Sequence, residues 1–399
     1  MGMLDSDVII AGAGPVGSVA ALYLAQRGIS VILLESGQDC AQDLRASTFH
    51  APTLEMLDEL GVAQEILDRG LRAPIFQFRE RRSNDFLEFD LTELSDMTRF
   101  PYRVQCEQHV LARHISKLLL AESKAQVCFS HRVVAFHQDQ ESVTVAIETP
   151  HALKKLRSRY LIAADGGNSI IRKWLGAEFE GFTYPEKFLC LSTELELRQY
   201  IPDLAYVNYV SDPDEWLVLL RVPRVWRILV PADMSIDDDT LRSDAKRDEV
   251  FMNLIGKSGV RTEHRTIYRV HQRVVNRFDH GRVFLVGDAA HLNNPLGGFG
   301  MNSGIHDVWN LGEKIVSSLR RGHNEEAFKL FGRQRSAVTH KFIQAQTIQN
   351  KYLLDHGGDQ AHKQRWQEMR SIRNDPAARR QFLLRQAMFT SLAEAAAIE

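Results

Sequence analysis

The feature that most constrains this chain is a glycine-rich turn close to its start. Residues 7–11 form a short apolar run, GAGPVG follows at residues 12–17, and an apolar helical pattern continues from there. A second apolar run then ends at Glu35. The order strand, G-x-G-x-x-G, helix, strand and acidic residue is typical of a βαβ unit that binds a dinucleotide. The sequence therefore predicts a parallel sheet with a dinucleotide at its carboxyl edge.

Each residue of this turn has a distinct expected task. Gly12 allows the tight turn, Gly14 lets the backbone approach a pyrophosphate, and Gly17 allows close packing of helix on strand. Pro15 begins the helix, whose positive N-terminal end attracts phosphate, and Glu35 can accept hydrogen bonds from ribose hydroxyls. A purely structural glycine turn is the alternative interpretation, and the turn alone does not separate NAD from FAD.

Two further motifs, called anchors below, have the same pattern: an apolar strand that ends in an acidic residue and a glycine. One strand ends near residue 164 and the other near residue 286, and each is followed by a helical pattern. Because strand ends at this edge of an open α/β sheet hold ligands, we expect both anchors near the dinucleotide. The two anchors are Asp165-Gly166 and Gly287-Asp288, and the second is followed by glycines at 297, 298 and 300.

Composition narrows the class of protein. The chain has 399 residues with 49 Lys and Arg against 51 Asp and Glu, a net charge of −2, and it is 44% hydrophobic. Near-neutral charge disfavours a nucleic-acid binder, and no apolar run approaches the roughly 20 residues that span a bilayer. The first residues contain no basic segment typical of a signal peptide, so a cytoplasmic location is expected. The four cysteines form no C-x-x-C pair, so neither disulfides nor a metal site is predicted.

The three motifs, in this order and spacing, resemble the class A flavoprotein monooxygenases, the aromatic hydroxylases similar to p-hydroxybenzoate hydroxylase. The resemblance extends from residue 5 to about residue 355. It includes an Arg that opens the helix after the second strand, here Arg45, in the pattern R-A-x-x-x-x-x-x-T-L-E. It also includes a Gln that opens a helix after a crossing strand. We assign that Gln to Gln108, because Leu111 and Ile115 follow at helical spacing, with Gln105 as the competing register.

The resemblance implies a chemistry as well as a fold. In the family, FAD is reduced by NADH or NADPH and reacts with O₂ to a C4a-hydroperoxide, which hydroxylates a small phenolic or heteroaromatic substrate. The cofactor supplies this reactivity, while the protein binds, orients and excludes water. Baeyer–Villiger oxidation and ubiquinone-ring hydroxylation by the same fold remain alternatives. A redox-silent flavin-binding module is a third alternative, from a different class of protein.

Cofactor roles follow from the resemblance, position by position. The pyrophosphate and ribose would lie against the glycine-rich turn and Glu35, and Asp288 would hold the ribityl chain. Pro295 would line the reacting edge of the flavin, where we also expect it to take part in catalysis. The backbone that opens the last helix would bind the pyrimidine end, where reduced flavin carries negative charge. The remaining implied cofactor contacts are Arg45, Gln108, Asp165, Gly166, Gly287, Gly298, Gly300, Met301 and Asn302.

Two further side chains are candidates for the chemistry itself. His50 lies in a flavin-adjacent segment and could relay a proton from a phenol, although helix capping or packing is the alternative for it and for His291. Arg221 ends a predicted strand and could bind a substrate carboxylate, with a simple strand-end charge as the alternative. Arg172, beside the Asp165 motif, is either a nicotinamide contact or a solvated helix residue.

The expected fold is α/β: a Rossmann-like FAD-binding domain interrupted by an antiparallel β-sheet substrate domain, with C-terminal helices. Proline-punctuated strands between residues 182 and 275, with one amphipathic helix, would form a sheet that covers the flavin. We expect a monomer or homodimer that binds a small aromatic substrate and O₂ and has no nucleic-acid or membrane partner. The expected boundaries are 1–74, 91–181 and 276–324 for the FAD-binding domain, 75–90 and 182–275 for the substrate domain, and 325–399 for the helical region.

Overall fold

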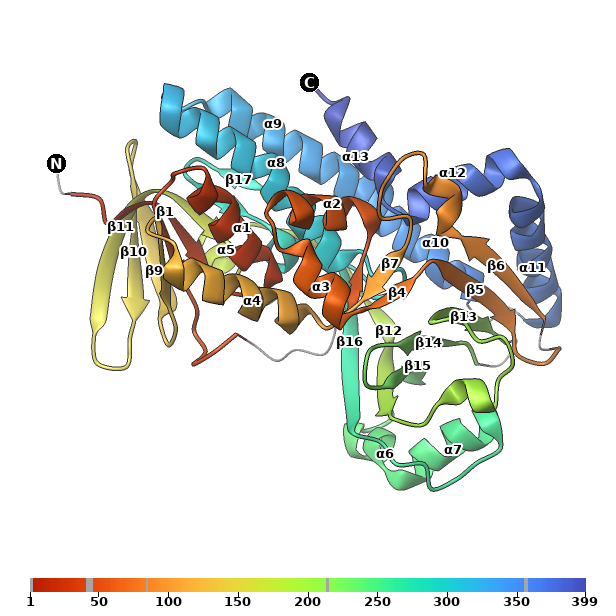
Figure 1. Ribbon diagram of the computed structural model, residues 1–399. Coiled ribbons are helices and arrows are strands. Elements are labelled where there is room, and N and C mark those ends of the chain that lie inside the picture. The colour runs from red at the N-terminus through yellow and green to blue at the C-terminus, as the bar shows by residue number, and fades with distance from the viewer. Residues whose placement is uncertain (1–2, 41–45, 84, 213–214, 355–357) are drawn as a thin grey trace.

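The computed structural model describes the whole chain except residues 1–2, 41–45, 84, 213–214 and 355–357. Arg45, an expected cofactor contact, lies outside the described residues. Two large sheets, helices around the first sheet and a C-terminal group of helices make up the molecule (Figure 1). The predicted fold class, an α/β FAD-binding unit combined with a second sheet and C-terminal helices, is confirmed.

The first sheet is built around the glycine-rich turn. Five strands pair in parallel in the order β8–β2–β1–β11–β18, and β9, β10 and β17 extend the sheet by antiparallel pairing. Val8, Ile9 and Ile10 of the central strand are all fully buried, as expected for a parallel strand covered on both faces. The strands are β1 (Ser6–Ala11), β2 (Val31–Leu34), β8 (Ala125–Cys128), β9 (Arg132–Gln138), β10 (Val143–Glu148), β11 (Leu153–Ala163), β17 (Asp279–His280) and β18 (Val283–Leu285).

Helices cover this sheet and share one hydrophobic core with it. Helix α1 packs between α4 and α8, and α9 packs on α8 along the upper side of the view in Figure 1. Glycines allow the close approach of α1 and α8: a Cβ on Gly304 would lie only 2.6 Å from Cγ2 of Val16. The helices are α1 (Pro15–Gln26), α2 (Ala51–Glu59), α3 (Ala63–Arg69), α4 (Gln108–Ala121), α5 (Ile170–Trp174), α8 (Gly300–Arg321) and α9 (Glu325–Val338).

The second sheet has an outer face and an inner face, and each packs against different helices. Outer side chains such as Leu189, Leu217 and Ile228 pack against α7, whereas alternate positions such as Phe188 and Val218 face the C-terminal helices. Its eight strands pair antiparallel except for one parallel pair, β13 with β5. In order across the sheet they are β19 (His291–Leu292), β16 (His264–Val275), β12 (Phe179–Thr193), β15 (Trp226–Asp233), β14 (Leu217–Arg221), β13 (Val207–Ser211), β5 (Ile75–Glu80) and β6 (Phe86–Asp90), with α6 (Asp238–Arg242) and α7 (Asp244–Ile255) beneath.

Two local features of this part differ from the sequence-based expectation. Strand β12 was expected to begin at residue 188, but it starts at Phe179 and continues through Pro185 at a shift in register between Thr183 and Lys187. A bulge of this kind is where a strand tolerates proline. The expected single helix over residues 239–255 is two helices, because the Ser243 hydroxyl caps a new helix by accepting from the Lys246 N–H.

A small sheet and the C-terminal helices complete the fold. Strand β7 (Arg103–Gln105) pairs with β3 (Thr48–Phe49) and β4 (Leu71–Ala73), between the two large sheets. The helix expected over residues 325–352 contains a π-helical segment, Thr339–Gln344, before α10 (Ala345–Leu354). The helix expected over residues 359–384 is broken at Asp375, which caps α12. The last helices are α11 (Gly358–Asn374), α12 (Pro376–Gln386) and α13 (Phe389–Ala396).

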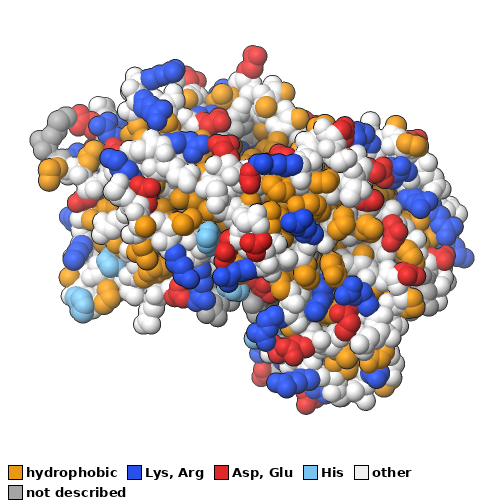
Figure 2. Space-filling view, in the orientation of Figure 1, with side chains coloured by type: hydrophobic (Ala, Val, Ile, Leu, Met, Phe, Trp, Pro, Cys, Tyr) orange, Lys and Arg blue, Asp and Glu red, His pale blue; other side chains and the backbone are white. Residues whose placement is uncertain are grey.

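The surface carries acidic and basic side chains intermixed on the face seen in Figure 2. Within the described part of the chain, none of the helices is both long and apolar enough to cross a membrane.

Candidate active site

The glycine-rich turn has the geometry that a pyrophosphate requires. Gly12 has a φ of +98°, and a Cβ there would lie 2.3 Å from the Ala164 carbonyl oxygen. A Cβ on Gly17 would lie 1.9 Å from the Gly12 oxygen, whereas one on Gly14 would meet nothing within 4 Å. Only glycine therefore fits at 12 and 17, and the backbone at Gly14 is open to a ligand in front of Pro15, the first residue of α1.

Glu35 is joined to this turn. One carboxylate oxygen accepts from the Ala13 N–H at 2.8 Å and the other from the Gly37 N–H at 2.8 Å. The carboxylate thus fixes the end of β2 beside the turn, where an adenosine ribose is expected. Gln108 is the first residue of α4, as the resemblance requires, whereas Gln105 ends β7 and is fully buried.

The Asp165 motif follows β11 at the same edge of the sheet. Oδ2 of Asp165 accepts from the Ile170 N–H at 3.0 Å, while buried Oδ1 has no partner among the residues that the structure describes. Burial raises the pKa of this carboxyl group. Arg172 is buried rather than solvated: it donates to the Gly167 and Ala289 carbonyls at 2.6 and 3.1 Å. The solvated interpretation of Arg172 is therefore wrong.

A buried charge cluster supports the turn at Gly287. Asp307 is fully buried, and its Oδ2 accepts from the Gly287 N–H at 2.9 Å and from His291 Nε2 at 2.8 Å. Its Oδ1 accepts from Arg335 Nε at 2.5 Å. Although burial opposes ionisation, Arg335 and His291 lower the pKa of Asp307 to about 2. The next residue of the motif, Asp288, is exposed at the strand end and is thus accessible to a ribityl chain.

The loop between β19 and α8 forms the wall expected to contact the flavin. Gly297 and Gly298 have φ values of +106° and +70°, and a Cβ on Gly298 would lie 2.8 Å from Cβ of Thr48. The first hydrogen bond of α8 runs from the Ser303 N–H to the Phe299 carbonyl at 2.8 Å. The preceding N–H groups, of Gly300, Met301 and Asn302, therefore lie ahead of the helical ladder at the positive end of its dipole, where the resemblance implies the pyrimidine end of a flavin.

Asn302 and His50 join this loop to β3. The Asn302 amide donates to the carbonyls of Thr48 and Gly298 at 2.8 and 2.7 Å and accepts from the His50 N–H. The His50 ring lies 5.4 Å from the Phe299 ring and donates from Nε2 to the Gly297 carbonyl at 2.8 Å. Burial lowers the pKa of His50 well below its usual value, so the ring is neutral and Nδ1 carries a lone pair. This favours His50 as a hydrogen-bond acceptor over a base that titrates near neutral pH.

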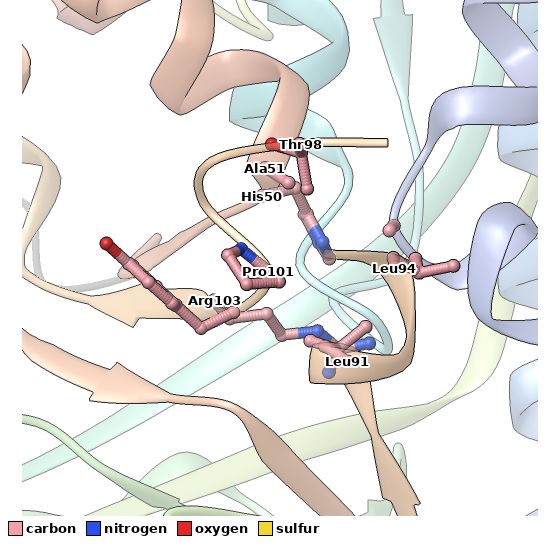
Figure 3. Close-up of a pocket in the computed structure, with 9 residues that line it drawn as sticks. His50, Ala51, Leu91, Leu94, Thr98, Pro101 and Arg103 are labelled. Carbon is pink, nitrogen blue, oxygen red and sulfur yellow. The ribbon is translucent and has the colours of Figure 1, made fainter. Parts of the chain in front are cut away.

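A narrow pocket, too tight to hold a water molecule, lies beneath His50 (Figure 3). Four separate parts of the chain form it: the start of α2, the segment from η1 (Leu91–Leu94) to Thr98, the start of β7 and the end of the α12 segment. The lining residues are His50, Ala51, Leu91, Leu94, Thr98, Pro101, Tyr102, Arg103 and Ala387.

The structure does not bring Arg221 to this region. Its side chain lies on the outer face of the second sheet, like Leu217 and Leu219 of the same strand. It pairs with Glu196 at 3.9 Å and lies 5.9 Å from the Trp226 ring. The geometry therefore favours a strand-end charge over a substrate contact.

The C-terminal helices contribute residues that sequence reasoning missed. Asn350 on α10 donates to the Leu296 carbonyl at 3.2 Å and accepts from Gln386 of α12 at 2.9 Å. One turn earlier, the Thr347 carbonyl accepts from Asn294 at 3.0 Å. The only hint in the sequence is that these polar residues interrupt the apolar face of a helix. Pro295 thus lies in a loop that the C-terminal helices hold in place.

Comparisons with known proteins agree with this geometry. A family model described as FAD binding domain matches residues 5–346. Para-nitrophenol 4-monooxygenase of Pseudomonas sp. strain WBC-3 is 31% identical over 386 residues, 94% of either chain. The 6-hydroxy-3-succinoylpyridine 3-monooxygenase HspB of Pseudomonas putida is 29% identical over 93% of this chain and 95% of its own.

Solved structures give the same result. The crystal structure of p-nitrophenol 4-monooxygenase PnpA from Pseudomonas putida DLL-E4 superposes with a TM-score of 0.91 over 98% of this chain and 99% of its own, at 26% identity. The fold and site define a flavoprotein, and the chain belongs to the class A FAD-dependent aromatic monooxygenases. It is an FAD-dependent monooxygenase that hydroxylates aromatic compounds, and the main sequence-based prediction of function is confirmed.

Proposed function

We propose that this enzyme uses NADH or NADPH and O₂ to hydroxylate a small phenol or a hydroxylated heteroaromatic compound. The observation that carries the proposal is the convergence, at one edge of the first sheet, of the glycine-rich turn, the two acidic motifs and the N-terminus of α8. The names of the two relatives, a nitrophenol monooxygenase and a hydroxypyridine monooxygenase, support this substrate class. Bound FAD would supply the electron transfer and the activation of O₂ that no side chain can provide.

The residues of this chain would bind and orient the reactants. Gly12, Gly14 and Gly17 make room for the pyrophosphate, Glu35 faces the ribose, and Asp288 holds the ribityl chain. The loop at Pro295 and Gly298 would shape the flavin wall, and the N–H groups of Gly300, Met301 and Asn302 would face the negative pyrimidine end. The further members of this proposed cofactor site are Pro15, Arg45, Gln108, Asp165, Gly166 and Gly287.

His50 would act beside the reacting ring. Its neutral imidazole presents Nδ1 as an acceptor, so it can orient a phenolic O–H without itself becoming charged. This role needs the ring held still, and the bond to Gly297 and the packing on Phe299 do so.

Several features of the enzyme remain part of the proposal. The FAD-binding domain comprises 1–74, 91–181 and 276–324, the substrate domain 75–90 and 182–275, and the helical region 325–399. The enzyme works in the cytoplasm as a monomer or homodimer.

The test uses the purified holoenzyme. The protein is expected to be yellow, to release FAD on denaturation, and to oxidise NADH or NADPH faster when a phenol from a panel is added. The hydroxylated product should equal the reduced cofactor consumed. Protein that binds no FAD, or reduced-cofactor oxidation that yields only hydrogen peroxide with every phenol, would refute the proposal. Gly17→Ala, whose Cβ cannot fit, should lose FAD and activity together.

A further inference from the structure

The pocket beneath His50 contains a buried cation that the cofactor site does not use. Arg103 begins β7, its side chain is 1% exposed, and its guanidinium carbon lies 4.4 Å from the centroid of the Phe76 ring. Its Nε and Nη2 are buried and have no hydrogen-bond partner in the described part of the chain. Figure 3 shows this side chain extending below His50 toward the turn at Leu91.

A guanidinium in this state requires an anion. A buried charge without a partner costs several kcal/mol, and the guanidinium of arginine keeps its charge in proteins. The other buried arginines of the site have partners: Arg335 pairs with Asp307, and Arg172 donates to two carbonyls. The ring of Phe76 covers one face of the Arg103 guanidinium but offers no acceptor for its N–H groups.

His50 connects the pocket to the wall expected to contact the flavin. His50 lines the pocket with its ring and is bonded to Gly297 of that wall. On the other side, Phe76 belongs to the aromatic cluster on the inner face of the second sheet, which includes Phe78 and Phe89. The recess is too narrow for a water molecule as the structure has it, so its lining side chains would have to move apart to admit an aromatic ring, which would then lie between a neutral acceptor, His50, and a cation, Arg103.

We propose that Arg103 is the anion-binding residue of the substrate pocket, and that the aromatic substrate carries a carboxylate or phenolate oxygen that pairs with it. This rests on the proposed function and adds the charge of the substrate to it. The planar fork of arginine suits a carboxylate, and Nε and Nη2 are the two donors of one edge.

The experiment measures binding rather than turnover. Holoenzyme is titrated without NADH or NADPH, and the flavin absorbance change is followed for two matched pairs: 4-hydroxybenzoate against 4-hydroxybenzamide, and 4-nitrophenolate against 4-nitroanisole. At least one anion should bind the parent tenfold or more tightly than its neutral partner. Arg103→Met should weaken the binding of that anion about ten- to hundredfold, because a charge-assisted hydrogen bond is lost. Neutral ligands should change less than threefold, and Arg103→Lys should restore part of the difference.

Controls separate this inference from the proposed function. Arg224→Met removes the same charge from an exposed side chain and should leave every affinity unchanged. If the parent does not distinguish either anion from its neutral partner, or Arg103→Met weakens neutral and anionic ligands equally, the inference fails while hydroxylation can still stand. Displacement of chloride alone, with no organic anion preferred, also overturns it. If Arg103→Met loses its FAD, the inference is decided by two other measurements: the preference of the parent for the anionic ligand over its neutral partner, and the affinities of the Arg103→Lys variant.

Discussion

Replacement of Asp307 by asparagine tests the buried cluster beneath the Gly287 turn. Asp307→Asn keeps the size of the side chain but removes the negative charge that neutralises Arg335, whose side chain is 1% exposed. Breaking a buried ion pair by removing one partner leaves an uncompensated charge and costs about 3–5 kcal/mol. The lowered pKa of Asp307 gives a free energy of similar size: the fall from 3.8 to about 2 corresponds to roughly 2.5 kcal/mol of stability.

The pH dependence follows from the sign of that shift. Because the folded pKa lies below the unfolded one, the stability from the Asp307 charge is complete above about pH 4. It is lost as the pH falls from about 4 to 2. The difference in stability between parent and Asp307→Asn should therefore be largest near neutral pH and shrink over that acid range.

The assay is unfolding followed by intrinsic tryptophan fluorescence at saturating FAD, across pH 2–8. Asp244→Asn is the matched control, since Asp244 is an exposed partner of Arg247 and Arg265 and its loss should cost less than about 1 kcal/mol. A double variant, Asp307→Asn with Arg335→Met, should recover much of the loss, because the second change removes the stranded cation. A stability for Asp307→Asn within about 1 kcal/mol of the parent at pH 7 would refute the reasoning.

Three further outcomes are expected. Asp288→Ala should weaken FAD binding by about 1–3 kcal/mol, measured by equilibrium dialysis, because a ribityl hydroxyl loses its acceptor; unchanged retention would contradict the assignment. Asn350→Ala should lower stability by about 1–3 kcal/mol and shift the flavin spectrum, because the Leu296 carbonyl loses its donor, whereas a variant with the parent's spectrum would show that α10 does not set the loop. Arg221→Ala should leave the KM for an anionic phenol that the enzyme hydroxylates within about twofold, since Arg221 pairs with Glu196 on the outer face; a tenfold rise would restore it to the substrate site.

Local patterns were sufficient for the part of the fold that binds the dinucleotide. Part of the need for glycine in the turn at residues 12–17 is local, because Gly12 has a positive φ and a Cβ on Gly17 would meet the Gly12 oxygen. The approach of Gly12 to Ala164 is not local, but the G-x-G-x-x-G spacing indicates it. The strand ends at Asp165 and Gly287 are marked by glycines next to them in the sequence. A single sequence is enough to recognise such turns, because the residues that form the turn are also the residues of the motif.

The substrate side depends on contacts between distant segments, which a single sequence does not reveal. Arg103 looks like any strand charge until Phe76 and His50 are placed around it. Arg221 was a candidate for a substrate carboxylate because it ends a strand, with a strand-end charge as the alternative, but the alternation of β14 turns it to the outer face with Leu219. A shift of one position along a strand reverses the face, so strand-end arginines cannot be assigned to a pocket from the pattern alone.

The C-terminal helices explain how one chain couples the two sides of the site. Helix α12 lies against η1 through Arg379 and Arg380, which pair with Glu93 and Asp96, and η1 lines the pocket. The same region reaches the flavin wall through Asn350, which bonds to both the loop and α12. Pocket shape and loop position therefore share their supports, so a substitution in this helical region should alter ligand binding and the flavin environment together.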